Sequence, residues 1–230
     1  MIENLNKKRY RLETITIEKV SANYFLTKNY VRQIEIHYLG KENKADVVQI
    51  LTRDYSFSNE DNSEGKLIKQ ISYLFDEVEL SIDIEGTMLK VLNKEKLQTR
   101  WKQIQIKLME FHKGSVIENY FQQITELLKN EQELISFLEG YNMFGLLFNG
   151  LWSRNNQIKT KLTKEGYTQM MIPEIVDGKL RQKIIMRDTN NVQIDDFKGI
   201  NFYTQNTLEE SYIEIQENNH HFKYSLLWIG

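Results

Sequence analysis

The alternation of apolar and polar residues changes its period once, near residue 93, and separates a predicted hairpin from a predicted helix. From Val78 to Glu85 the two classes alternate, which is the period of a strand with one buried face. Glu85-Gly86 predicts a turn into a second strand over 88–92. After Asn93, a potential N-cap, the spacing becomes helical. The apolar stripe of this helix comprises Leu97, Trp101, Ile104, Leu108 and Phe111.

Strand periods also precede this unit. Residues 9–20, 30–38 and 45–55 predict three antiparallel strands, because short polar segments connect them. The apolar positions of the first strand change parity near Glu13, which predicts a bulge or a late strand start there. Apolar residues over 67–75 then recur at helical spacing and predict one short helix. One face of the second strand is expected to carry Tyr30, Arg32, Ile34, Ile36 and Tyr38.

The region from 93 to 150 reads as a block of about three helices. Ser115 and Glu118 have the spacing of a capping box, which predicts the start of the second helix. A third helix is expected to begin near Glu131 and to run into 141–152, a segment that is apolar nearly all round. Helices of this kind supply a cover for the apolar face of a sheet.

The C-terminal part returns to the strand period. Asp177-Gly178 and Asn218-Asn219 each separate two strand-like segments and predict hairpin turns. Pro173 lies in the first of these hairpins, so its strand is expected to be broken or at a sheet edge there, because proline has no N–H to donate.

These elements predict an α+β protein. Its core would be a large, curved antiparallel β-sheet with the inserted block of about three helices packed on one face. We expect one domain over 1–230, because no flexible linker separates the parts. Its parts are N-terminal strands 9–55, a central hairpin 78–92, a helical block 93–150 and C-terminal strands 167–229.

Composition narrows the classes of partner. The 230 residues include 30 basic and 32 acidic side chains and no cysteine. A net charge of −2 provides no general attraction to nucleic acid or to an anionic membrane. No apolar run approaches the length needed for membrane insertion, and the N-terminus has no signal-peptide pattern. We therefore expect a soluble, cytoplasmic protein, with its oligomeric state left open.

Candidate chemistry is sparse. His220 and His221 are neighbours in a predicted strand and point to opposite faces, so they are poorly placed to bind one metal ion. No nucleophile, phosphate-loop or metalloprotease motif occurs. A basic run, Lys7 to Arg11, is the best nucleic-acid candidate, but acidic residues flank it and it reads better as the border of the first strand. The expectation is no catalytic residue, no metal and no cofactor.

The segment 141–152 is the preferred candidate for a binding site. Its aromatic residues could form part of the core or the wall of a groove, with glycines that allow close approach. Among them we expect Phe144 to be core, and Phe148 or Trp152 to be the contact. The candidate binding residues are Tyr141, Phe144, Phe148 and Trp152.

Two functions of different classes follow. The first is a non-enzymatic protein-binding module, such as an adaptor, an assembly component or an immunity- or inhibitor-type partner. The alternative is a carrier of an apolar small molecule or lipid, held in a groove between the curved sheet and the helices. Such a sheet closed by helices resembles bacterial lipid-carrier folds. An enzyme that uses residues scattered along the sequence is the third possibility.

Overall fold

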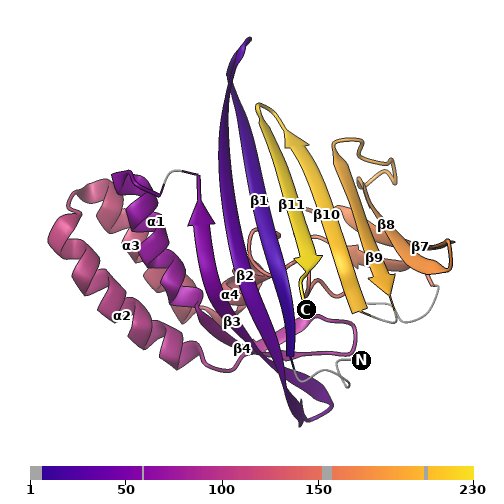
Figure 1. Ribbon diagram of the computed structural model, residues 1–230, viewed down its shortest axis with the longest axis horizontal. Helices are drawn as coiled ribbons and strands as arrows, with labels where there is room; N and C mark the ends of the chain where they lie inside the picture. The colour runs from indigo at the N-terminus through magenta and orange to yellow at the C-terminus, as the bar shows by residue number, and fades with distance from the viewer. Residues whose placement is uncertain (1–6, 59, 152–156, 205–206) are drawn as a thin grey trace.

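Eleven strands form one antiparallel sheet in the computed structural model, which describes residues 7–58, 60–151, 157–204 and 207–230 (Figure 1). The strand order is β5-β4-β3-β2-β1-β11-β10-β9-β8-β7-β6. The N-terminal strands are β1 (Lys7–Ser21), β2 (Tyr24–Glu42), β3 (Ala45–Phe57), β4 (Glu77–Ile82) and β5 (Met88–Val91). The C-terminal strands are β6 (Lys159–Leu162), β7 (Thr168–Val176), β8 (Lys179–Arg187), β9 (Phe197–Thr204), β10 (Thr207–Glu217) and β11 (His220–Trp228).

The helices gather beside the N-terminal half of this sheet, next to β3 and β4 (Figure 1). They are α1 (Ser63–Ser72), the 3₁₀ turn η1 (Tyr73–Phe75), α2 (Lys94–Phe111), α3 (Ser115–Lys129) and α4 (Glu131–Leu138). Apolar side chains from the strands and the helices meet in one buried cluster that includes Ile34, Val48, Leu80, Trp101, Phe121 and Phe144. The predicted α+β class, with helices packed on a large antiparallel sheet, is confirmed.

The predicted irregularity near Glu13 is wrong. The pairing of β1 with β11 runs through this position without a register shift, and the shift in its pairing with β2 lies between Lys19 and Ser21. Side chains on the helix-facing side of β1 continue as Tyr10, Leu12, Thr14 and Thr16. The apolar pattern changes because the helix-facing side of β1 carries two threonines, which line a cavity, where apolar residues would be expected. The strand therefore contains no extra residue at this point.

The central hairpin forms as predicted, but the helix after it begins differently. Gly86 takes a φ of 80°, and the Asp83 carboxylate accepts hydrogen bonds from the N–H groups of Glu85 and Thr87, both at 2.8 Å. At the start of α2, the Asn93 side chain makes no capping bond. Its Oδ1 accepts from the N–H of Glu79 at 3.0 Å.

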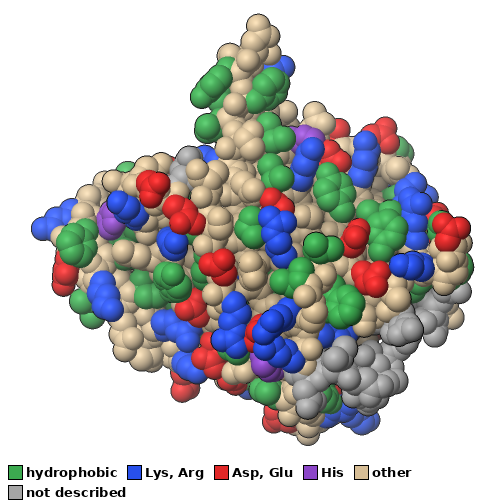
Figure 2. Space-filling model, viewed as in Figure 1, with side chains coloured by type: hydrophobic (Ala, Val, Ile, Leu, Met, Phe, Trp, Pro, Cys, Tyr) green, Lys and Arg blue, Asp and Glu red, His purple; other side chains and the backbone are tan. Residues whose placement is uncertain are grey.

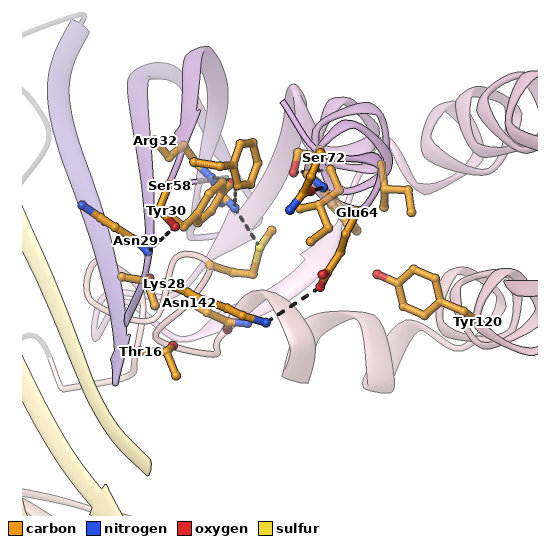
Figure 3. Close-up of a pocket in the computed structure, with 18 of the residues that line it drawn as sticks. Thr16, Lys28, Asn29, Tyr30, Arg32, Ser58, Glu64, Ser72, Tyr120 and Asn142 are labelled. Carbon is orange, nitrogen blue, oxygen red and sulfur yellow. Dashed lines mark hydrogen bonds and ion pairs between the residues drawn. The ribbon is translucent and has the colours of Figure 1, made fainter. Parts of the chain in front are cut away.

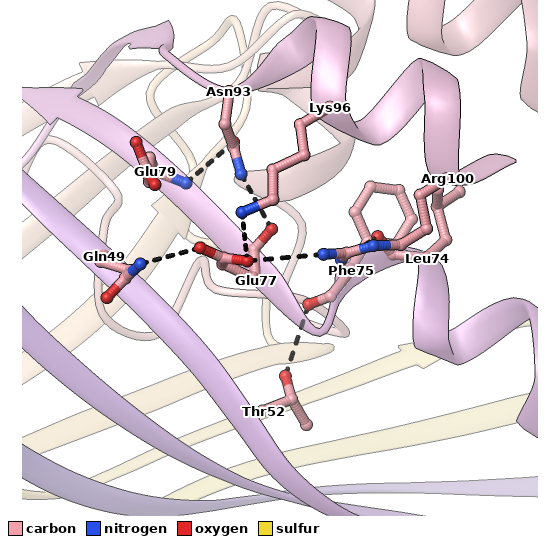
Figure 4. Close-up of polar contacts among 9 residues, drawn as sticks. All are labelled: Gln49, Thr52, Leu74, Phe75, Glu77, Glu79, Asn93, Lys96 and Arg100. Atoms are coloured by element: carbon pink, nitrogen blue, oxygen red, sulfur yellow. Dashed lines mark hydrogen bonds and ion pairs between the residues drawn. The ribbon is translucent and has the colours of Figure 1, made fainter.

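Polar contacts fasten α2 to the edge of β4 (Figure 4). Asn93 Nδ2 donates to the carbonyl of Glu77 at 3.1 Å, and the Glu77 carboxylate accepts from Lys96 at 2.6 Å and from Gln49 at 2.9 Å. The hydrogen bond from Lys96 lowers the pKa of Glu77. Asn93 therefore joins helix and strand, because an asparagine side chain satisfies strand backbone groups as readily as helix ones.

The capping box at Ser115 is also not formed. Gly114 occupies the N-cap position with a φ of 118°, and Ser115 is already the first helical residue. The third helix starts where expected, because the Asn130 side chain accepts hydrogen bonds from the N–H groups of Gln132 and Glu133.

Both C-terminal hairpin turns are confirmed, at Asp177-Gly178 and Asn218-Asn219. Pro173 pairs with β8, while β6 pairs with β7 only as far as Met171, so this proline lies at a sheet edge as predicted. The strands β6 and β9 had no clear sequence pattern. The strand β6 has only four residues. In β9, Gly199 breaks the alternation of side chains, and close packing requires a glycine there, because a Cβ would lie 2.8 Å from Ile184 Cβ.

Among the described helices, none is long and apolar enough to cross a membrane. The expectation of one cooperatively folded domain over 1–230 stays a prediction.

Candidate ligand-binding cavity

A cavity of about 370 Å³ lies between the helix-facing side of β1 and β2 and the segments α1, η1, α3 and α4 (Figure 3). Its volume falls in the range of small-molecule sites, about 300–1,000 Å³. The apolar part of its lining includes Phe57, Ile68, Ile71, Phe75, Tyr120 and Phe137. The polar part includes Thr14, Thr16, Lys28, Asn29, Ser58 and Asn142.

The local structure explains why this space is not filled. The helix α1 is tied at its C-terminal end, where the Tyr55 hydroxyl donates to the carbonyl of Ser72 at 2.7 Å. The rings of Phe75 and Phe137 pack at 5.4 Å between centroids on the helical side. On the sheet side, β1 contributes threonines where its earlier positions carry a tyrosine and a leucine. Small side chains opposite a tethered helix leave a gap between the two layers.

Arg32 of β2 lines this cavity and is only 5% exposed. Its Nε and Nη2 donate to the Tyr30 hydroxyl at 3.1 and 2.9 Å, and Nη2 also contacts the sulfur of Met143 at 3.2 Å. The guanidinium lies 5.4 Å from the centroid of Phe144 and 5.7 Å from that of Tyr55. These aromatic faces attract the cation.

One nitrogen of this guanidinium is left without a partner. Nη1 of Arg32 is buried and forms no hydrogen bond with the described residues. No described carboxylate comes within 4.0 Å of the guanidinium. Burial raises the pKa of Asp76, while Arg100, Tyr55 and Arg32 act to lower it. Arg32 therefore interacts electrostatically with Asp76 without forming an ion pair with it.

The rim of the cavity carries charged side chains. Lys28 Nζ lies 3.8 Å from a carboxylate oxygen of Glu64, and both side chains are more than half exposed (Figure 3). The backbone N–H of Asn29 donates to the Ser58 hydroxyl at 3.1 Å. Ser58, which follows β3, and Asn62, the N-cap of α1, thus border the cavity on the side of α1.

The predicted site residues lie mainly in the core. Phe144 is 0% and Phe148 is 1% exposed, and residues 141–147 form turns, with no continuation of α4. Phe144 is core as expected. Of the two residues expected to be the contact, Phe148 or Trp152, Phe148 is buried, whereas Asn142 in the same segment is exposed. Trp152 lies outside the described residues. Whether any of these residues binds a partner stays a prediction.

Tyr141 is half-buried and turns towards the C-terminal strands. Its hydroxyl accepts a hydrogen bond from Gln169 at 2.7 Å, and its ring lies 5.6 Å from that of Tyr224. Burial raises its pKa to about 12, although the bond from Gln169 opposes the shift. The neighbouring residues Asn142 and Met143 line the cavity. The segment 141–151 therefore borders the cavity through these two residues and not through the aromatic residues that the sequence indicated.

Gly145 has a packing role in this segment. A Cβ at this position would lie 2.1 Å from the carbonyl oxygen of Glu139, so a larger residue would displace backbone. Its own N–H donates to the carbonyl of Gly140 at 3.0 Å.

Sequence reasoning missed the cavity, although a signal was present. Arg32 was placed on the same strand face as Ile34 and Ile36, and both isoleucines are buried. A cation on an otherwise apolar face marks a special environment, because charged groups are rarely buried without a partner.

The described residues include no group of three or more histidine, aspartate or glutamate side chains that could hold a metal ion. His221 hydrogen-bonds to Glu214, and its neighbour His220 stacks on Phe222 at 5.8 Å. Each histidine of this pair thus has its own local contact.

The chain matches no protein-family model, and no curated protein sequence is detectably similar to it. One similar solved structure concerns lipid–protein interactions in lipovitellin, with 10% identity and a TM-score of 0.46 over 97% of this chain. The chain spans about a quarter of that protein's length. Another is a DUF1329 family protein from Desulfovibrio piger, with 8% identity and a TM-score of 0.23, covering 98% of this chain and 85% of that one.

Proposed function

We propose that this protein is a non-enzymatic carrier that holds a small molecule with an apolar body in the cavity between β1–β2 and the helices. The observation that carries the proposal is the cavity itself, with its volume of about 370 Å³ and its wall of aliphatic and aromatic side chains. Burying the apolar surface of a ligand here gains ~25 cal/mol per Å² removed from water.

The titratable groups of the lining support binding over catalysis. Of the described lining residues, none is a histidine, and the carboxylate of Glu64 is in an ion pair with Lys28. A general base needs a free acceptor near the operating pH within hydrogen-bond reach of a substrate. The lining therefore offers surfaces and hydrogen bonds for a ligand, which is the chemistry of a carrier.

We expect Ile68→Trp to block the cavity. Ile68 lines it and is 38% exposed, so a larger ring can occupy the space without entering the closed core. A neutral fluorescent probe, N-phenyl-1-naphthylamine, should bind the unmodified protein and bind this variant at least about tenfold more weakly, or ~1.4 kcal/mol. Fluorescence titration measures both affinities.

The matched control is Ile106→Trp on α2, at a side chain that is 65% exposed and outside the cavity lining. This variant should bind the probe as the unmodified protein does. Equal affinity for the probe in both tryptophan variants, with both folded, would refute binding in the cavity.

A second candidate, protein binding, is favoured by the β1–β2 hairpin. Apolar side chains gather on the part of the hairpin that projects beyond the rest of the molecule (Figure 2). Pairing of β1 with β11 stops at Glu18, and pairing of β2 with β3 starts only at Tyr30. The exposed apolar residues of this tip are Val20, Tyr24 and Phe25. Aromatic side chains on an isolated projection suit the apolar cleft of a partner protein.

Site-specific crosslinking tests this candidate. A photoreactive phenylalanine analogue in place of Phe25 should form one discrete protein adduct in cells of the native host. The same analogue in place of Ile175, which is equally exposed at 58%, is the control and should not form it. Identical adducts from both positions, or only lipid adducts from the tip, would exclude a specific protein partner there.

A further inference from the structure

We propose that the ligand of this cavity is a single-chain amphiphile whose anionic headgroup binds Arg32. The proposal rests on the proposed carrier function and identifies the class of molecule carried. Its starting point is the buried Arg32 guanidinium, which lines the cavity and whose Nη1 has no hydrogen-bond partner among the described residues.

The hydrogen-bond partners of Arg32 carry no negative charge, and Asp76 acts on it without forming an ion pair. The Tyr30 hydroxyl is a neutral acceptor, and the Met143 sulfur is a weak one. Aromatic faces attract a cation, but they do not replace an oxygen acceptor for its N–H groups. A buried cation with an unsatisfied N–H costs free energy until an acceptor reaches it. An anion that enters the cavity can supply both the charge and the acceptor.

The geometry of arginine favours a carboxylate or a phosphate headgroup. A guanidinium presents its N–H groups in a planar fork that matches two oxygens of one anion. Nη1 is the arm of the fork that no described residue occupies. The headgroup would lie against this arm, where Figure 3 places Arg32 beside Tyr30 at the sheet side of the cavity.

The apolar chain has a defined path away from this point. Ile71, Phe75 and Phe137 form the helical side of the lining, opposite β2. A chain laid along them buries its methylene groups, each of which contributes to the affinity. At the rim, Lys28 is paired with Glu64 and is more than half exposed, so Arg32 is the buried cation that faces an anion inside the cavity.

The competing explanation is a purely structural arginine whose aromatic surroundings suffice. The two explanations differ in the ligands that the unmodified protein should prefer. A structural arginine, whose charge is balanced by the aromatic faces and by Asp76, predicts little preference between neutral and anionic headgroups. An anion site predicts a strict order, because a second cation next to the buried guanidinium is repelled.

The experiment compares ligands with the same ten-carbon chain in the unmodified protein by isothermal titration calorimetry. Decanoate or decyl phosphate should bind at least about thirtyfold more tightly than decanol, and decyltrimethylammonium should bind most weakly. The ratio of decanoate to decyl phosphate distinguishes a carboxylate ligand from a phosphate ligand. Equal affinities for decanoate, decyl phosphate and decanol would overturn the proposal.

The second part of the experiment uses the variant Arg32→Met, which removes the charge. Its control is Arg32→Lys, which keeps the charge. In Arg32→Met the preference for decanoate over decanol should fall to about threefold or less, while N-phenyl-1-naphthylamine still binds. A preference that survives in Arg32→Met would also overturn the assignment. If Arg32→Met does not fold, the ligand series on the unmodified protein decides alone. Binding of the neutral probe without a headgroup preference refutes only this inference, whereas no binding of any ligand or probe refutes the carrier function as well.

Discussion

Replacing Trp101 by alanine is expected to lower the free energy of unfolding by ~3–5 kcal/mol. Trp101 is 2% exposed, and its ring meets Phe121 edge-on at 5.6 Å between centroids. Its indole N–H donates to the Thr125 hydroxyl at 2.9 Å, which ties α2 to α3. The substitution removes the ring packing and this bond together, and leaves a cavity that the two helices cannot close.

The control for this substitution is Phe111→Ala on the same helix. Phe111 belongs to the same predicted apolar stripe but is 81% exposed, so its loss should change stability by less than ~0.5 kcal/mol. Chemical denaturation of both variants measures the difference. A Trp101→Ala protein as stable as the unmodified one would contradict the packing of α2 against α3.

Replacing Glu35 by glutamine is expected to lower the free energy of unfolding by ~1.5–3 kcal/mol at pH 7, the range of hydrogen bonds to charged groups. This carboxylate is almost fully buried on the sheet, and the cationic side chains of Lys7, Arg9 and Arg53 contact it. Burial alone would raise the pKa of Glu35, but hydrogen bonds from these groups lower it far below its usual range. The donors are Arg53, Lys7, His37 and Arg9.

The effect should depend on pH in one direction. Because the folded-state pKa of Glu35 is depressed, its stabilisation is complete above the unfolded-state pKa near 4.5 and is lost as the pH falls below it. The difference between the unmodified protein and Glu35→Gln should therefore shrink between pH 5 and about pH 3. Thermal unfolding at both pH values measures this difference in stability. The control is Glu174→Gln, because Glu174 forms an exposed ion pair with Arg181, and its effect should be less than ~1 kcal/mol. A difference that does not change with pH would contradict the depressed pKa.

Local patterns were sufficient for much of the fold. The β7–β8 turn follows from Asp177 and Gly178 alone, and both take positive φ values, 51° and 75°. The sheet edge at Pro173 follows from its missing N–H. Such features depend on a few consecutive residues, so the sequence contains the whole physical cause.

Features that depend on distant partners could not be predicted in the same way. The side chain of Asn93 was expected to cap α2, yet it bonds to the backbone of Glu77 and Glu79, which only the folded hairpin brings near. Phe148 was one of two residues expected at the surface, with Trp152, because of the neighbouring glycine and polar turn, but it lies in the same buried apolar cluster as Phe144. In both cases a long-range contact replaced a local preference.

The cavity is the clearest case of this limit. Its lining joins Thr14 and Thr16 of β1, Arg32 of β2 and Phe137 of α4, which no sequence spacing connects. The traces in the sequence were the change of parity in β1 and the cation among the isoleucines of β2. Both signals mark positions where a buried strand face carries a polar or charged residue in place of the usual apolar one.

Methyl NMR during a titration with decanoate tests the central claim most directly, because it locates the ligand. Ile68, Ile71 and Met143 line the cavity and carry methyl groups, and Ile106 on α2 lies outside the lining. A carrier predicts saturable shifts of the methyl signals of these three cavity residues with one common affinity, and no shift at Ile106. Cavity methyl signals that stay in place both at saturating decanoate and at saturating N-phenyl-1-naphthylamine would contradict the carrier function.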